Sequence, residues 1–344
     1  MVRVVVDAMG GDLAPAVPVR AALQAVREEP DAKIILIGRQ ELIEKELSAA
    51  FRNPSENSSD SSRIEIVNAE EVIETGEPPV MAIRKKKESS LVKGLYMVKH
   101  SDADAFLSAG SSGAILVGGQ VIVGRLKGVE RPPLAPLIPT QAGVSCLIDC
   151  GANVDARPSH LVQFAKMGSI YMEYVHGVQA PKVAIVNIGV EEEKGNMLVR
   201  ETFPILKNCP DIRFVGSIEA RDIPYGKADV VVCEAFVGNV ILKLYEGAGT
   251  MLTSVLKKSL MTSVRAKLGG LLIKPALKGA LKKFNASEYG GAPLLGLNGL
   301  VVKAHGSAKE KEFVIAVKQC VQFEKQQINE KINENINGLV PVDF

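Results

Sequence analysis

Short apolar runs alternate along the chain with longer segments of helical periodicity. Most of these runs are continuously apolar, which is typical of strands that are buried on both faces of a mainly parallel sheet. The predicted strands cover residues 2–6, 33–38, 63–67, 104–108, 145–149, 182–187, 212–216, 229–233 and 299–303. Because helical segments separate them, the pattern predicts an α/β fold with a doubly wound, mainly parallel sheet.

Two polar segments interrupt the apolar pattern. Residues 51–62 are rich in serine and other turn-forming residues, so they predict a surface loop. Residues 326–337 predict a polar helix that frays. The whole chain, 1–344, is expected to form a single α/β unit, either undivided or with two lobes around a cleft.

A basic segment spans residues 247–287, which contain eight basic residues and no acidic one. Apolar residues recur every four positions on one helical face: Leu252, Leu256, Leu260, Val264 and Leu268. Gly269-Gly270 is expected to break the helix, so the segment predicts a protruding, basic, amphipathic helical hairpin. Its apolar stripe indicates either a core or subunit interface, or docking on an anionic surface, such as lipid headgroups or an acidic protein.

Composition narrows the class of protein. The chain has 344 residues, of which 47% are hydrophobic, and its net charge of +2 gives no indication of nucleic-acid binding. Five scattered cysteines without a C-x-x-C pair argue against a disulfide framework or a structural zinc site. No run of 18 apolar residues occurs, and the N-terminus enters a strand directly, so we expect a cytoplasmic protein.

Loops rich in glycine and small polar residues follow several predicted strands. They cover residues 7–12, 108–114, 149–158, 187–196 and 233–240. Ligands of open α/β sheets bind beyond the carboxyl ends of the strands, where helix N-termini and bare glycine backbone attract anions. None of these loops is a P-loop or a complete G-x-G-x-x-G motif, which weakens the case for ATP or a dinucleotide. Together they predict a phosphate-bearing ligand, with no metal and no cofactor.

The candidate substrate-binding residues lie on these loops and after the last predicted strand. They are Asp7, Gly10, Gly11, Asp12, Ser108, Gly110, Ser112, Gly113, Asn153, Asp155, Gly238 and His305. Gly10 and Gly11 allow close backbone approach to a ligand. Because like charges repel, Asp7 and Asp12 are expected to fix the loop through backbone N–H groups, or to orient a cation such as Lys194.

Structural interpretations stand beside the functional ones. Lys194 follows three glutamates and can be an ordinary surface lysine. Asn239 can cap a helix or aim its amide into a cleft. A lone histidine such as His305 is more often structural than catalytic. A further set carries oxygen ligands for a metal, but its spacing matches no familiar metal loop: Asp149, Asn153 and Asp155.

Two segments of the chain echo one another. The segments that start at Ala103 and Ala228 both begin Ala-Asp, continue with three apolar residues, and place a glycine ten residues later, at Gly113 and Gly238. Each predicts a strand, a short loop and a helix N-terminus. The echo indicates either the common pattern of βαβ units or two related anion-facing loops that flank one cleft.

Taken together, the loops closely resemble those of the bacterial phosphate acyltransferases of phospholipid synthesis, over nearly the whole chain. The matching stretches are VVVDAMGGDLAP (4–15), RKKKESS (84–90), SAGSSGA (108–114), VGRLKGVERPPLAP (123–136), DCGANVDARPSHLVQFA (149–165), EEKGN (192–196), IEARDI (218–223), FVGNVILK (236–243), YGGAPLLGL (289–297) and VVKAHGS (301–307).

The resemblance implies transfer of a fatty acyl group from acyl-acyl-carrier protein to inorganic phosphate. The acyl phosphate would feed a membrane acyltransferase that acylates glycerol 3-phosphate. It also implies a homodimer, a fold like those of isocitrate dehydrogenase and phosphotransacetylase, and peripheral contact of the hairpin with a membrane or with the acidic carrier protein. Its catalytic residues fall on Lys194 and Asn239. We expect Lys194 to neutralise phosphate or the oxyanion, and Asn239 to donate a hydrogen bond with help from the helix N-terminus near Gly238.

Two loops depart from the family pattern. Ser111-Ser112 stand where the family often has Asn-Thr, and Glu234-Ala235 stand where it often has Asp-Gly. The roles of Ser112 and Glu234 therefore stay open. An acyl-CoA-dependent enzyme like phosphotransacetylase and a membrane-peripheral scaffold without activity are the alternatives. A β-decarboxylating dehydrogenase would need a nicotinamide site and an aspartate cluster, and the sequence shows neither.

Overall fold

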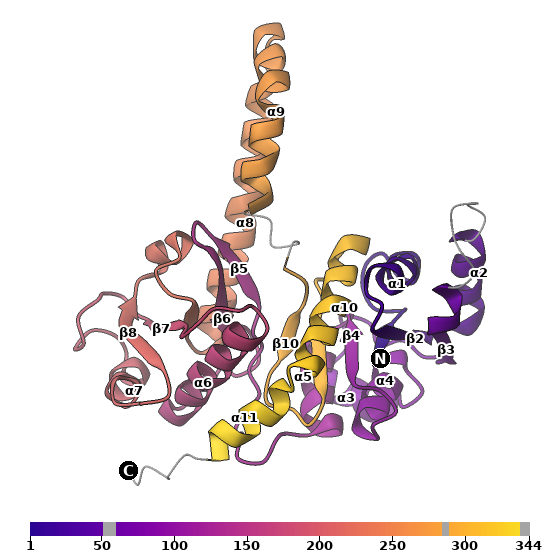
Figure 1. The fold of residues 1–344 in the computed structure, drawn as a ribbon, viewed down its shortest axis with the longest axis horizontal. Coiled ribbons are helices and arrows are strands. Elements are labelled where there is room, and N and C mark those ends of the chain that lie inside the picture. Colours follow the sequence, from indigo (N-terminus) through magenta and orange to yellow (C-terminus); the bar gives the residue numbers. More distant parts are fainter. Residues whose placement is uncertain (51–59, 284–288, 338–344) are drawn as a thin grey trace.

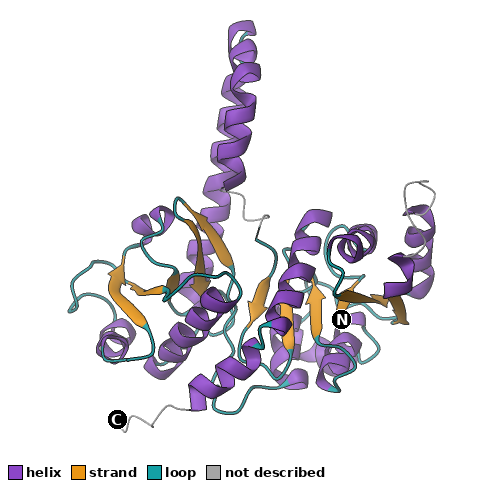
Figure 2. Ribbon diagram, viewed as in Figure 1, coloured by secondary structure: helices purple, strands orange, loops and turns teal. Residues whose placement is uncertain are grey.

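The strands form two sheets rather than one. The computed structural model describes residues 1–50, 60–283 and 289–337. The first sheet has the order β10–β11–β4–β1–β2–β3, and the second has the order β5–β6–β9–β7–β8. All neighbouring strands are parallel except the edge pairs β10–β11 and β5–β6. The predicted α/β class with mainly parallel strands is therefore confirmed (Figure 2).

The predicted strands all appear, within a residue or two. The first sheet contains β1 (Val2–Asp7), β2 (Ala32–Gly38), β3 (Ile64–Asn68), β4 (Ala105–Ser108), β10 (Ala292–Leu294) and β11 (Leu300–Lys303). The second contains β5 (Leu137–Thr140), β6 (Gly143–Ile148), β7 (Lys182–Val186), β8 (Arg213–Ile218) and β9 (Val230–Val232). Only β5 and β10 were not predicted. Each contains a proline, Pro139 or Pro293, and lies at a sheet edge, where a missing backbone N–H is tolerated.

Helices cover both faces of the first sheet. Val4 and Val6 of β1 pack into a core shared with α1 (Ala16–Glu28) and α10 (Glu310–Lys325), whereas Val5 packs into a second core with α4 (Ser90–Lys99). This alternation is expected of a strand buried on both sides. The first sheet and its helices are called the first lobe. Its remaining helices are α2 (Gln40–Ala50), α3 (Pro79–Lys85) and α5 (Ser112–Gly118), with short helical turns at Asp60–Arg63 and Gly119–Val123. Of the predicted loop 51–62, residues 51–59 lie outside the described residues.

The second sheet and its helices form the second lobe (Figure 1). It contains α6 (Pro158–Tyr174), α7 (Met197–Lys207), a 3-10 turn at Ala220–Tyr225, α8 (Ala235–Leu260) and α9 (Val264–Lys283). The C-terminal α11 (Ile328–Asn337) packs on α6. The expectation that this last helix frays is wrong, because Ile328, Ile332 and Ile336 lie one turn apart and are buried in the main core.

Helices α8 and α9 project far beyond the body of the protein (Figure 1). The chain between them turns at residues 261–263, not at Gly269-Gly270, which lie inside α9. Ser263 explains the new helix start, since its hydroxyl accepts a hydrogen bond from the N–H of Ala266 at 3.1 Å. We call residues 247–283 the arm; residues 284–287 of the predicted hairpin lie outside the described residues. Among the described helices, none is both long and apolar enough to cross a bilayer.

Candidate functional site

The loops that follow β1, β4 and β11 meet at one edge of the first sheet. The N–H of Asp12 donates to the carbonyl of Gly306 at 2.8 Å, and the N–H of Ala304 donates to the carbonyl of Ser108 at 2.9 Å. Gly10 fills the tightest point between the loops. A Cβ atom there would lie 2.7 Å from both Asp7 Oδ2 and the backbone nitrogen of Gly110, so only glycine fits.

Asp7 holds these loops together from inside the protein. Its side chain is 2% exposed and accepts hydrogen bonds from Ser108 Oγ at 2.7 Å and from the N–H of Met9 at 3.0 Å. Burial raises the pKa of Asp7, and hydrogen bonds from Ser90 and Ser108 oppose that rise. Asp7 is therefore a buried anchor of the loop rather than a surface that faces substrate. The role of Ser90 was missed, although it lies in the family-like stretch RKKKESS.

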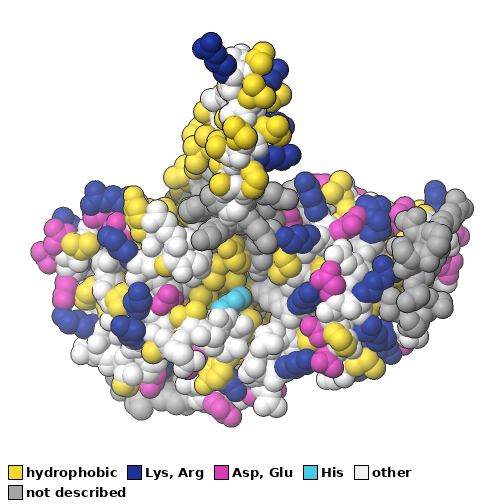
Figure 3. Space-filling view, turned by 45° about the horizontal axis from the view of Figure 1, so that its top comes forward, with side chains coloured by type: hydrophobic (Ala, Val, Ile, Leu, Met, Phe, Trp, Pro, Cys, Tyr) yellow, Lys and Arg dark blue, Asp and Glu magenta, His cyan; other side chains and the backbone are white. Residues whose placement is uncertain are grey.

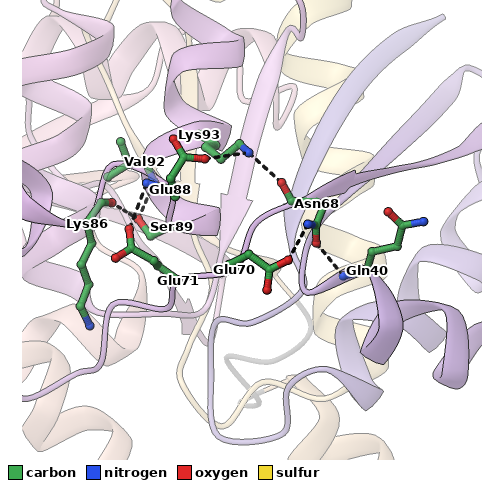
Figure 4. Close-up of polar contacts among 9 residues, drawn as sticks. All are labelled: Gln40, Asn68, Glu70, Glu71, Lys86, Glu88, Ser89, Val92 and Lys93. Carbon is green, nitrogen blue, oxygen red and sulfur yellow. Dashed lines mark hydrogen bonds and ion pairs between the residues drawn. The ribbon is translucent and has the colours of Figure 1, made fainter.

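A network of polar contacts surrounds the start of α4 (Figure 4). Ser89 caps α4, because its hydroxyl accepts from the N–H of Val92 at 3.3 Å. Lys93, one turn later, donates to the carbonyl of Asn68 at 2.8 Å and contacts Glu88 at 3.3 Å. These contacts tie the start of α4 to the end of β3, and so fix the position of Ser90 beside Asp7.

The remaining first-lobe candidates are more accessible. Ser111, not Ser112, caps α5 by accepting from the N–H of Ala114 at 3.4 Å, which leaves the Ser112 side chain exposed at the first helical position. His305 is exposed, and its Nδ1 lies 2.9 Å from the hydroxyl of Ser307. Asp12 and Gly11 lie beside the loop of Gly306.

In the second lobe, Asp149 and Asn153 hold each other at the end of β6. The Asp149 carboxylate is fully buried and accepts from Asn153 Nδ2 at 2.8 Å, from the N–H of Asn153 at 2.7 Å and from the N–H of Leu134 at 2.9 Å. Burial raises the pKa of Asp149. Asn153 also donates to the carbonyl of Pro132 at 2.9 Å. The pair therefore builds the loop, while Asp155 is exposed farther along it. Within the described residues, no three His, Cys, Asp or Glu side chains are grouped to hold a metal.

Lys194 lies on the loop that follows β7, with 48% of its side chain exposed. Its ammonium pairs with Glu191 Oε2 at 2.8 Å, and this hydrogen bond raises the pKa of Lys194. The partner of Lys194 in this structure is thus Glu191, and not Asp7 or Asp12. The loop closes on Asn187, a residue that was not among the predicted site residues.

The start of α8 contradicts one expectation. Glu234 caps this helix by accepting from the N–H groups of Phe236 at 2.5 Å and Val237 at 2.9 Å. Because a carboxylate occupies these donors, the helix N-terminus is not free to bind phosphate. Gly238 is required by packing, since a Cβ atom there would lie 1.9 Å from the carbonyl oxygen of Asp149. Asn239 does not cap the helix; its side chain is exposed beside Gly151.

The sequence echo corresponds to equivalent places in the two sheets. The β4–α5 segment lies between β11 and β1 of the first sheet, and the β9–α8 segment lies between β6 and β7 of the second. Figure 3, turned toward the side from which the arm projects, shows a strip of hydrophobic side chains between the lobes below the arm. The candidate residues thus lie on segments that follow strands of both sheets.

Comparison with known proteins agrees with this architecture. A family model described as "Fatty acid synthesis protein" matches residues 2–331. The chain is 47% identical over 334 residues to a phosphate acyltransferase of Clostridium novyi, covering 97% of this chain and 98% of the relative. It is 48% identical over 342 residues to a phosphate acyltransferase of Alkaliphilus oremlandii, covering 99% of each chain.

Solved structures show the same fold at low sequence identity. The EutD phosphotransacetylase from Staphylococcus aureus superposes with a TM-score of 0.59 at 16% identity, covering 95% of this chain and 94% of that one. A phosphotransacetylase from Streptococcus pyogenes gives a TM-score of 0.57 at 17% identity, covering 93% and 94%. The expected likeness to the phosphotransacetylase fold is therefore confirmed.

Proposed function

The chain belongs to the family of fatty acid synthesis proteins that includes the phosphate acyltransferases, and on that premise we propose that it transfers a fatty acyl group from acyl-acyl-carrier protein to inorganic phosphate. The enzyme is an acyltransferase whose acceptor is phosphate, and the carrier-protein donor is the finer part of the proposal. The observation that supports it is that Lys194 and Asn239 lie in the segments that follow the carboxyl ends of β7 and β9, which are adjacent and parallel.

The reaction demands positioning and charge rather than a covalent nucleophile. An oxygen of hydrogen phosphate attacks the thioester carbonyl carbon, the new carbon–oxygen bond forms, and the carbon–sulfur bond breaks. The electron pair leaves with the thiolate, which takes up the proton that phosphate loses. Reacting atoms held about 3–3.5 Å apart gain most from such a site.

An ammonium and an amide suit these steps. Lys194, held in its charged form by Glu191, can neutralise the phosphate or the oxyanion that develops on the carbonyl oxygen. Asn239 is exposed and can donate its amide N–H to the same oxyanion. Because Glu234 already occupies the N–H donors at the start of α8, the side chains of Lys194 and Asn239 stabilise the oxyanion.

The arm suits an acidic or membrane partner. Among its exposed side chains, basic residues such as Lys257, Lys258, Arg265 and Lys267 accompany apolar ones such as Leu268 and Leu272. We infer a cytoplasmic homodimer whose arm contacts carrier protein, the other subunit or the membrane surface, and whose product passes to a membrane acyltransferase for glycerol 3-phosphate. Charge reversal at Lys257 and Lys258 should raise the KM for carrier protein or weaken liposome binding. If both stay unchanged, the arm is a plain subunit interface.

Thiol release from palmitoyl-carrier protein, with and without phosphate, tests the function. We expect release only with phosphate, and slower turnover with a palmitoyl-CoA donor. Faster turnover on the CoA thioester would favour the acyl-CoA alternative, and liposome binding without thiol release would favour a scaffold. Lys194→Ala and Asn239→Ala should each lower kcat by about 10²–10³-fold. Lys207→Ala, which removes an exposed lysine paired with Glu192, is the matched control.

A further inference from the structure

Lys303 ends β11 at the same sheet edge as the first-lobe loops. It pairs in register with Ser108 of β4, the residue whose hydroxyl binds Asp7, and the next residue, Ala304, donates its N–H to Ser108. Most of the Lys303 side chain is withdrawn from solvent. The sequence analysis gave this lysine no role, although it lies in the family-like stretch VVKAHGS.

The side chains that act on Lys303 electrostatically come from α8 of the other lobe. They are Lys243, which disfavours the ammonium, and Glu246, which favours it. Both lie on the face of α8 that carries Asn239, at spacings of four and seven residues. Lys303 therefore lies at the junction between the first-lobe loops and the helix of Asn239.

This junction carries more positive than negative charge. Glu246 is already paired with Lys243, at 2.8 Å, so one carboxylate serves two ammonium groups. Among the described residues, the hydrogen bond found for Lys303 Nζ goes to its neighbour's carbonyl, Ala304 O, at 2.9 Å. An ammonium has three donors, so two remain for a ligand. Burial and Lys243 lower the pKa of Lys303, as expected for a cation that lacks a full counter-charge.

We propose that the Lys303 ammonium binds the inorganic phosphate that attacks the thioester, as the first-lobe counterpart of Lys194. This inference rests on the proposed function and adds a residue to it. A dianion would supply the counter-charge missing at the junction, and charge-assisted hydrogen bonds are stronger where water is partly excluded. Substrate would then be held between a cation from each lobe, with Lys303 binding phosphate and Lys194 facing the developing oxyanion.

The test compares Lys303→Met and Lys303→Arg with wild type in phosphate-dependent thiol release from acyl-carrier protein. Methionine keeps an unbranched apolar side chain in β11 and removes the charge. We expect Lys303→Met to raise the KM for phosphate about 10-fold or more, with the KM for the acyl donor within twofold. Lys303→Arg should restore part of the affinity. Lys318→Met, which removes a first-lobe lysine paired with Glu28 at 2.7 Å, should change neither constant.

The pH dependence supplies a second readout. In wild type, phosphate binding should weaken as pH rises through the lowered pKa of Lys303, and in Lys303→Arg this weakening should shift to higher pH. If Lys303→Met folds as judged by circular dichroism but keeps the wild-type KM for phosphate, or loses only kcat, the proposal for Lys303 is wrong. If wild type itself shows no phosphate-dependent release, the proposed function fails instead.

Discussion

The side-chain amide of Asn187 donates a hydrogen bond to the carbonyl oxygen of Lys194 at 3.1 Å. The same Nδ2 lies 3.1 Å from the hydroxyl of Ser217, and Asn187 Oδ1 accepts from the N–H of Ile188 at 2.8 Å. Asn187 directly follows β7, an inner strand of the second sheet, so its side chain ties the loop that carries Lys194 to the carboxyl end of a rigid strand. A precisely placed ammonium on an exposed loop needs such an anchor.

Asn187→Ala should therefore lower activity by displacing Lys194, and not by removing a contact with substrate. We expect kcat to fall about 10-fold or more, because small displacements of a catalytic group are costly, and stability to fall by about 1–3 kcal/mol. Steady-state kinetics and thermal unfolding measure the two effects. Asn208→Ala, which removes a single exposed hydrogen bond to Pro204, is the control. Unchanged kcat in Asn187→Ala would show that the anchor does not matter for catalysis.

Glu234→Ala should destabilise α8 at its origin. The carboxylate satisfies two N–H groups that would otherwise lack partners, and losing a cap costs about 0.5–2 kcal/mol. Thermal unfolding should show a lower midpoint, and Glu234→Asp should recover most of it, because aspartate also caps. Equal midpoints for wild type and Glu234→Ala would mean that Glu234 contributes nothing as a cap.

Glu324 on α10 should make stability depend on pH. Burial, followed by the charges of Asp104 and Glu330, raises the pKa of Glu324 from 4.5 to about 7; Arg3 pairs with Asp104 beside it. Because the folded pKa lies above the unfolded one, the stabilisation from protonated Glu324 is complete below about pH 4.5 and is lost as pH rises through about 7.

The variant Glu324→Gln should remove this dependence. Its unfolding midpoint, relative to wild type, should rise between pH 5 and pH 8. Glu310→Gln, which removes a carboxylate paired with Arg20 at the start of the same helix, serves as a control for general charge effects. A constant difference between Glu324→Gln and wild type across this range would contradict the raised pKa.

Ile332→Ala should destabilise the protein by about 2–5 kcal/mol, the usual range for a buried isoleucine. Ile332 is fully buried and lies on α11, which packs against α6 of the second lobe. Asn335→Ala, on the exposed side of α11, should change stability little. Chemical denaturation checks both, and a loss below about 1 kcal/mol for Ile332→Ala would argue that the helix is frayed.

Local patterns of the sequence were sufficient for much of the architecture. Continuous apolar runs located the strands because strands buried on both faces carry no polar side. Gly10, in the loop after β1, and Gly238, in the first turn of α8, marked places where other atoms approach too closely for a Cβ atom. The edge strands with Pro139 and Pro293 escaped notice because a short segment with proline has no strand pattern of its own.

Only the tertiary structure decided which polar residues anchor the loops and which face outward. Asp7, Asn153 and Asn239 were all candidate site residues in the sequence, but burial and hydrogen bonds turn the first two inward and leave Asn239 exposed. The role proposed for Lys303 depends on charges on α8, more than fifty residues away in the chain. The physical reason is that spacing along the chain sets local backbone structure, whereas burial and the field at a charged group depend on elements that only folding brings together.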